Sequence, residues 1–343
     1  MAFRETAGEQ AYLKAGLMGF AGAGKTYTAK EIAIGLHKYC EEKGLRKKGA
    51  PVFFLDTESG SDWVRKDFQK AGIPLMVDKT NAFTSLVPSV QQASADNGIL
   101  IIDSITHFWR ELCDSYARKK RRTNLEFQDW AWLKAQWAKF TTEFINSQCH
   151  IIMCGRAGYE YDFKEQESGK TELVKTGVKM KAETEAGFEP SILVLMERVH
   201  SMSQGGDRDI TITRTAQVLK DRACEIDGMT FTNPKFKDFL PHIKELNLGG
   251  THVGVDDSQT SLNIVPDDDK SWVREKNRRD IVLEEIQQHI ILLYPSSSAA
   301  DKKGKADFLQ DWFDTRSWKR VSTMSSGVLG EKYKAMQKER ADG

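Results

Sequence analysis

One stretch decides the fold of this chain: Gly19-Phe20-Ala21-Gly22-Ala23-Gly24-Lys25-Thr26. It fits the pattern G-x-x-x-x-G-K-[ST], the loop that wraps nucleotide phosphates. An apolar segment, Tyr12 to Met18, precedes it, and a helix-forming segment, Thr26 to Tyr39, follows it, as this loop requires. The alternative is a glycine-rich turn that binds nothing. The pattern and its context predict a bound nucleoside triphosphate.

Each part of the loop has a physical role. Glycines let the backbone turn tightly and point several N–H groups at the phosphates, and the helix N-terminus adds partial positive charge. Lys25 would reach the β- and γ-phosphates, and the Thr26 hydroxyl would ligate Mg²⁺. The residues expected to bind the nucleotide are Gly19, Gly22, Ala23, Gly24, Lys25, Thr26 and Tyr27.

Apolar runs alternate with helix-forming segments further along the chain. The strand-like runs are residues 52–56, 98–104, 150–156, 191–196 and 210–219. Such alternation predicts an α/β fold with a mostly parallel sheet covered by helices on both faces. Ligands bind at the carboxyl ends of such strands, and Glu58, Asp103 and Arg156 come where strands are predicted to end.

Two carboxylates at these strand ends have predicted roles. Asp103 follows four apolar residues and would hold the Mg²⁺ shell from across the phosphate loop; alternatively it only ends a strand or caps a helix. Glu58 could orient and deprotonate the attacking water. The alternative for Glu58 is a cap or a salt bridge.

These motifs together resemble the RecA-type ATPase core. The resemblance implies that Glu58 is the catalytic base and that ATP and Mg²⁺ are the cofactors. Arg156 or its neighbour Gly155 falls in the area where RecA proteins carry a polar sensor residue, although glutamine is usual there. Short phage-encoded RecA-like ATPases, including Sak-type single-strand annealing proteins, are the most similar group. Three later segments also look like that group: residues 154–161, 179–185 and 188–190.

The resemblance also extends to Lys220 and Arg222. RecA-superfamily ATPases present such a cation pair to the γ-phosphate of the neighbouring subunit. Cations two residues apart on an extended strand point the same way, and a pair supplied in trans can stabilise transition-state charge. The interpretation implies a homo-oligomer, ring or filament; the alternative is a solvated strand end.

Two segments are candidates for contact with nucleic acid. The first is the basic run Arg118, Lys119, Lys120, Arg121 and Arg122, with aromatic residues after it. Such a run attracts phosphates and aromatic rings stack on bases, but Trp130, Trp137 and Phe140 also have the spacing of a buried helix face. The second is a predicted polar loop over residues 157–177, which contains Lys164 and Lys170.

Composition limits the remaining possibilities. The net charge of +1 gives no global attraction for nucleic acid, so any such site must be local. No apolar run approaches the length of a membrane span, so no membrane partner is expected. The five cysteines lack metal-binding spacing, which favours a reducing compartment, the cytoplasm (of the host, if the chain is phage-encoded).

The sequence therefore predicts three regions and one main function. A RecA-like ATPase core is expected over residues 1–247, a polar linker over 248–270 and a small helical domain over 271–343. The favoured hypothesis is an oligomeric ATPase acting in DNA recombination or single-strand annealing, with single-stranded DNA as partner. The alternatives are a ring-forming helicase or translocase, and a nucleotide-gated assembly module that binds no DNA.

Overall fold

The computed structural model describes residues 5, 8–165, 171–202, 210–255 and 271–342. The chain consists of two compact units, Met1–Val255 and Asp256–Gly343. In the first unit the strands are β1 Lys14–Gly19, β2 Val52–Asp56, β3 Leu75–Lys79, β4 Ile99–Asp103, β5 His150–Glu165, β6 Thr171–Met180, β7 Ile192–Met202, β8 Ile210–Asp221 and β9 Thr230–Thr232. Its helices are α1 Lys25–Glu42, α2 Gly60–Lys70, η1 Phe83–Ser85, α3 Leu86–Ala95, α4 Ile105–Lys119, α5 Asp129–Asn146, η2 Thr184–Gly187 and α6 Phe236–Lys244.

The sheet has the strand order β3-β2-β4-β5-β1-β7-β8-β9, and β6 pairs with β5 beside this path. Strands β3, β2, β4, β5, β1 and β7 are parallel to one another, whereas β6, β8 and β9 pair in antiparallel fashion with β5, β7 and β8, respectively. The predicted mostly parallel α/β fold is confirmed.

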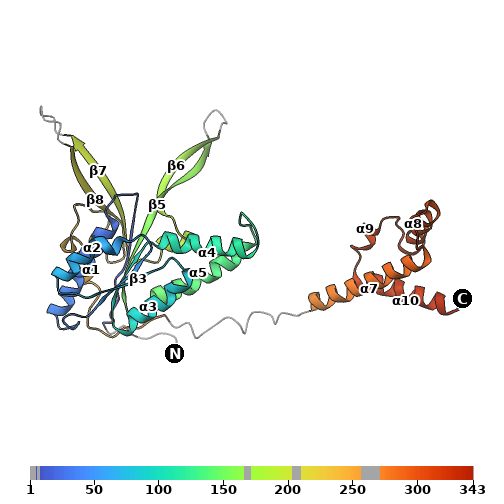
Figure 1. Cartoon of the computed structure of the whole chain (residues 1–343), viewed down its shortest axis with the longest axis horizontal. Helices are drawn as coiled ribbons and strands as arrows, with labels where there is room; N and C mark the ends of the chain where they lie inside the picture. The colour runs from blue at the N-terminus through green and yellow to red at the C-terminus, as the bar shows by residue number, and fades with distance from the viewer. Residues whose placement is uncertain (1–4, 6–7, 166–170, 203–209, 256–270, 343) are drawn as a thin grey trace. The chain divides into compact units, whose positions relative to one another are not determined.

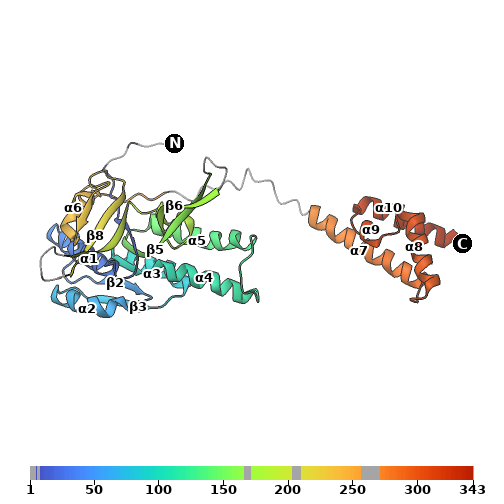
Figure 2. The same cartoon turned by 90° about the horizontal axis from the view of Figure 1, so that it is seen from above.

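Side chains alternate across the sheet and fill two apolar layers. Val52 and Phe54 of β2 join a core with α1, α2 and α6, while Phe53 and Leu55 join a second core with α3, α4 and α5. Strand side chains point alternately to opposite faces, so a strand buried on both sides is apolar at every position. The two helical layers lie on opposite sides of the sheet in Figure 2.

Two long hairpins extend beyond the carboxyl edge of the sheet. Gly19, the last residue of β1, pairs with Arg156 of β5 and with Met196 of β7. Both of these strands continue, and each pairs with an antiparallel partner, β6 or β8. Figure 1 shows the β5–β6 arm and the β7–β8 arm projecting from this edge and diverging.

The β5–β6 arm corrects one prediction. The loop expected over residues 157–177 is largely strand, since β5 runs through to Glu165 and Ala157 pairs with Met180. Alternation of Tyr159, Tyr161 and Phe163 with acidic residues suits a solvent-exposed hairpin. Lys170 and the side chain of Lys164 lie outside the described residues.

The core unit extends past the predicted boundary at residue 247. The Thr251 carbonyl accepts from Gln10, and His252 contacts the carbonyls of Gln10 and Asn146. Part of the segment predicted as a linker, residues 251–255, is thus tied to the core; residues 256–270 lie outside the described part.

The second unit is helical, with α7 Ser271–Leu293, α8 Ala299–Phe313, α9 Trp318–Val321 and α10 Ser326–Asp342. It has its own apolar core, made by Ile286, Ile290, Leu309, Phe313, Val321, Leu329 and Met336. Ser298 caps α8 through its side chain, which accepts from the backbone of Asp301. No helix in the described ranges is long and apolar enough to cross a membrane.

Candidate functional site

The phosphate loop joins β1 to α1 at the carboxyl edge of the sheet. Gly22 and Gly24 have φ of 73° and 93°, in the left-handed region that favours glycine. A Cβ on Gly19 would lie 2.5 Å from the Met196 carbonyl oxygen, so β7 also requires glycine there. The Lys25 ammonium donates to the carbonyls of Gly19 (3.0 Å) and Phe20 (3.1 Å). The sequence thus folds here into a tight loop at a helix N-terminus, the arrangement that binds phosphate groups through backbone amides.

A cavity of about 990 Å³ lies over this loop. It is lined by Gly19, Phe20, Ala21, Gly22, Gly24, Lys25, Thr26, Tyr27, Thr28, Glu58, Asp103, Arg110, Arg156, Ala157, Lys181, Arg214, Asn233, Pro234 and Lys235. The structure therefore brings the predicted loop residues together with Glu58, Asp103 and Arg156. Ala23 differs, because its side chain is buried in the core beneath the loop.

Thr26 and Asp103 meet at the floor of the cavity. The Thr26 hydroxyl donates to Asp103 Oδ2 at 2.5 Å, and a Cβ on Gly60 would lie 3.3 Å from the same oxygen. Hard oxygen ligands beside nucleotide phosphates suit Mg²⁺, so these residues fit the ion expected of a phosphate-loop site. Burial raises the pKa of Asp103 to about 6, so the carboxylate that would hold Mg²⁺ is charged above that pH.

A second buried carboxylate fixes the turn that carries Glu58. Asp56 accepts hydrogen bonds from the backbone N–H groups of Glu58, Gly60 and Ser61 at 3.0–3.1 Å. Burial raises the pKa of Asp56, but the hydrogen bonds from Ser61, Glu58 and Gly60 outweigh it and lower the pKa below its ordinary value. The turn from β2 into α2 is thus held by a charged side chain, and Glu58 is directed toward the cavity.

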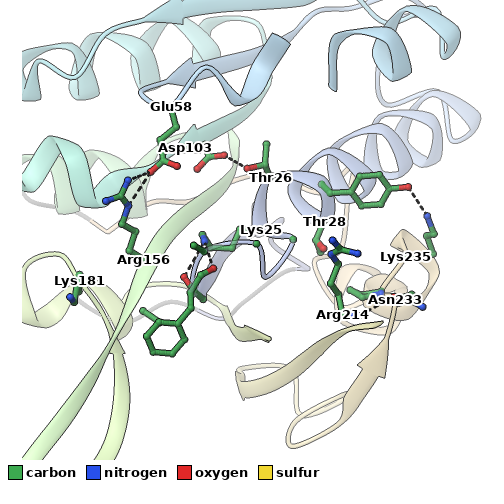
Figure 3. A pocket seen from close by; sticks show the side chains of 18 of the residues that line it. Lys25, Thr26, Thr28, Glu58, Asp103, Arg156, Lys181, Arg214, Asn233 and Lys235 are labelled. Carbon is green, nitrogen blue, oxygen red and sulfur yellow. Dashed lines mark hydrogen bonds and ion pairs between the residues drawn. The ribbon is translucent and has the colours of Figure 1, made fainter. Parts of the chain in front are cut away.

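The Glu58 carboxylate has cationic and polar neighbours in this structure. Its Oε1 accepts from Arg156 Nε and Nη2 at 3.2 and 3.0 Å and from Ser104 Oγ at 3.3 Å. His107 Nε2 lies 3.5 Å away. Burial and then the charge of Arg156 lower the pKa of His107, which favours a neutral ring. Figure 3 shows Arg156 bonded to Glu58 on one side of Lys25.

Lys220 and Arg222 lie away from the cavity of their own chain. Lys220 pairs with Leu193, and Leu193 pairs with Gly16 of β1, well below the phosphate loop. Both cations donate to one acceptor, the Phe188 carbonyl, at 2.5 and 3.1 Å. Lys220 is six residues along β8 from Arg214, which lines the cavity, a separation of about 20 Å. In this structure the pair therefore does not reach the phosphate position of its own chain's loop.

The basic run lies at the end of α4, and its side chains differ in their surroundings. Arg122 is paired with Glu126 (2.9 Å) and Asp129 (3.0 Å), and Arg118 donates to Ser115. Lys119, Lys120 and Arg121 are exposed. A second cavity of about 750 Å³, which includes Arg118 and Arg122 in its lining, connects the run with His107 and Thr57 beside Glu58.

The aromatic residues after the basic run include both buried and exposed side chains. Trp137 and Phe140 of α5 are buried in the core, as one interpretation predicts, whereas Trp130 and Phe127 are exposed.

Sequence reasoning missed the far wall of the cavity. Arg214 comes from β8, and Asn233, Pro234 and Lys235 come from the turn after β9. Lys235 donates to the Tyr27 hydroxyl at 3.1 Å, and Asn233 Oδ1 accepts from the Arg214 backbone at 3.1 Å. Only the pairing of β7, β8 and β9 brings these residues to the loop, and no local motif marks them.

This fold and this site define a phosphate-loop nucleoside triphosphatase. Proteins of that class share a strand–loop–helix unit, oxygen ligands for Mg²⁺ and a carboxylate near the terminal phosphate. In this chain the corresponding features are the loop between β1 and α1, the oxygens of Thr26 and Asp103, and Glu58 after β2. Residues 11–223 match the family model of the AAA domain, and the chain belongs to this family. It is therefore a nucleotide-binding protein of the ATPase type. None of the curated proteins compared matches the chain.

Proposed function

We propose that this chain is an oligomeric, RecA-like, Mg²⁺-dependent ATPase that binds single-stranded DNA and acts in DNA recombination or strand annealing. The resemblance to phage-encoded Sak-type annealing proteins motivates the proposal, as does the expected cytoplasmic setting, that of a host cell if the chain is phage-encoded. One observation carries the DNA part: an exposed aromatic row on the β5–β6 arm.

The aromatic row consists of Tyr159, Tyr161 and Phe163, at alternate positions of β5. Their exposed fractions rise along the arm, from 44% through 56% to 70%. Alternate strand residues share a face and are about 6.6 Å apart. Exposed rings at such intervals suit base stacking, which tolerates any base sequence. Lys175 lies over the Tyr159 ring at 3.7 Å and adds a cation for a phosphate backbone.

The aromatic row is connected to the nucleotide site by strand β5. Tyr159 packs against Phe20 of the phosphate loop, with ring centroids 5.0 Å apart. Arg156, three residues earlier on the same strand, holds Glu58. DNA that shifts β5 on binding would therefore also move Arg156 and, through it, the candidate base Glu58. We expect DNA binding and ATP hydrolysis to be coupled for this reason.

Single-stranded DNA is expected to raise the ATPase rate, and the stimulation should weaken between about 50 and 200 mM salt because phosphate contacts release counterions. Replacing Tyr161 and Phe163 together by alanine should reduce DNA affinity by about 1–3 kcal/mol per lost stack. DNA-binding titrations and steady-state ATPase assays measure both. The exposed Trp63→Ala on α2 is the matched control.

The outcomes distinguish the competing functions. A rate indifferent to DNA at both salt concentrations would contradict the DNA part and favour a nucleotide-gated assembly module. Acceleration of pairing between complementary strands supports annealing. ATP-driven separation of a tailed duplex would instead indicate a helicase or translocase.

The oligomeric part of the proposal rests on Lys220 and Arg222, which would reach the γ-phosphate of a neighbouring subunit. Arg222→Ala and Lys25→Ala are each expected to lower the ATPase rate. Their mixture should regain part of it, because an Arg222→Ala site can then receive Arg222 from a Lys25→Ala neighbour. Rates measured against mixing ratio check this. A mixture no more active than its components would contradict a shared site.

A further inference from the structure

The β7–β8 arm places two arginines opposite each other above the phosphate loop. Arg198 of β7 and Arg214 of β8 are direct partners in the antiparallel register, two residues beyond the pair Met196–Ala216. Met196 itself pairs with Gly19, where the loop begins. Directly opposed residues have Cβ atoms about 4.5–5.5 Å apart, so the two side chains share one face of the arm.

That face is turned toward the loop. A Cβ built on Gly22 would lie 3.4 Å from Arg198 Nη1, and one built on Gly24 would lie 3.1 Å from Arg214 Cδ. Two glycines of the motif thus lie directly under the two arginine side chains. Any side chain at Gly22 or Gly24 would crowd an arginine, in addition to the strain of the positive φ there.

The electrostatics of this arrangement are unfavourable without an anion. Like charges directly opposite on a sheet repel. Within the part of the chain that the structure describes, neither guanidinium forms an ion pair with a carboxylate. The backbone of Arg214 is nevertheless fixed on both sides by Asn233, which accepts from its N–H at 3.1 Å and donates to its carbonyl at 2.6 Å.

We propose that Arg198 and Arg214 are a phosphate-binding pair, supplied by the chain's own β7–β8 arm, that closes on the nucleotide from the side opposite Glu58. The inference rests on the nucleotide site of the proposed function and needs neither DNA nor a second subunit. Guanidinium groups suit it, because their planar fork bonds two phosphate oxygens at once.

The position of Arg214 identifies which phosphates the pair binds. Figure 3 shows Arg214 beside Thr28, on the other side of Lys25 from Glu58 and Asp103. Glu58, Thr26 and Asp103 mark the end where the terminal phosphate reacts. The arginine pair therefore binds the inner phosphates, which ATP and ADP share. This separates it from Lys220 and Arg222, whose proposed target is the γ-phosphate of a neighbour.

The test is equilibrium binding of ADP, and of ATP in the presence of EDTA to prevent turnover, to the full-length protein. Arg214→Ala and Arg198→Ala are each expected to weaken the binding of both nucleotides by the same factor, at least the roughly 10- to 150-fold that one hydrogen bond to a charged group contributes. Arg214→Lys should recover part of the affinity. Arg65→Ala, an exposed arginine of α2, is the matched control and should bind like the wild type.

A second measurement separates a ligand role from a structural one. Removing one of two opposed cations should leave the Tm of the nucleotide-free protein unchanged or raise it, while reducing the increase in Tm that saturating ADP gives the wild type. A structural role would instead lower the Tm of the nucleotide-free protein and leave that increase intact, and this result would overturn the inference.

The remaining outcomes are equally distinct. Unchanged affinity of both arginine variants, or a loss confined to ATP, would overturn the phosphate-binding pair. The nucleotide site itself would survive if Lys25→Ala still lost binding in the same assay. A wild-type protein that binds neither nucleotide would instead overturn the proposed function.

Discussion

Glu58→Gln is expected to retain ATP and to lower its turnover by about 10²- to 10⁴-fold, the range for losing a positioned general base. The amide keeps the size of the side chain, and the Asp56 hydrogen bonds that hold the turn involve only backbone and Ser61, so the site keeps its shape. It loses the carboxylate that can accept a proton from water. Single-turnover kinetics and nucleotide binding, measured on the same preparation, separate the two effects.

The ion pair between Glu58 and Arg156 makes this prediction specific. Arg156 is also exposed to the cavity, so the amide variant loses an ion pair near the surface, which contributes about 0–1 kcal/mol. Stability should therefore be close to that of the wild type. Asp62→Asn neutralises a nearby carboxylate on α2 that pairs only with Lys79 in the described structure, and it should turn over ATP normally. Near-normal turnover by Glu58→Gln would exclude Glu58 as the base.

The central sheet and the floor of the site could be predicted because their signals are local. The loop at residues 19–26 identifies its own strand and helix, and the apolar runs ending in Glu58 and Asp103 must finish at the same edge of a parallel sheet. That common edge is sufficient to bring Thr26 and Asp103 within hydrogen-bond distance. The contact between Thr26 and Asp103 at the floor of the cavity therefore follows from residue types and strand direction.

The arms and the far wall of the cavity could not be predicted in this way. The segment 157–177 is rich in charge and glycine, which indicates a loop, and its pairing of Tyr159 with Val178 is a contact between strands. Arg214 lies in a β-rich run, but its place above Gly24 depends on the register of β8 against β7 and of β7 against β1. Register is set by tertiary packing and by the turns, which a single sequence does not reveal.

Lys25→Ala is expected to lose nucleotide binding at concentrations that saturate the wild type. In the structure the ammonium donates to the carbonyls of Gly19 and Phe20, so it already lies across the mouth of the loop, where the phosphates must enter. Each hydrogen bond between an ammonium and a phosphate contributes about 1.5–3 kcal/mol, so its removal weakens affinity about 10- to 150-fold. With two phosphates contacted, the combined loss is larger. Calorimetric titration with ATP and ADP measures it.

A loss of nucleotide binding by Lys25→Ala is informative only if the variant is still folded. The Phe20 carbonyl is exposed, whereas Gly19 is a buried residue whose carbonyl loses a donor, which costs about 1–3 kcal/mol when no water replaces it. The Tm of the nucleotide-free variant should therefore fall by a few degrees, about 2–4 °C for each kcal/mol lost. Lys38→Ala removes an exposed lysine from the same helix and should bind nucleotide like the wild type. Because the loop glycines, the Thr26–Asp103 pair and the arginines of the arm all converge on the position that Lys25 serves, full ATP affinity in Lys25→Ala would mean that the phosphates lie elsewhere. The roles assigned to Glu58, Arg198 and Arg214 would then lose their basis together.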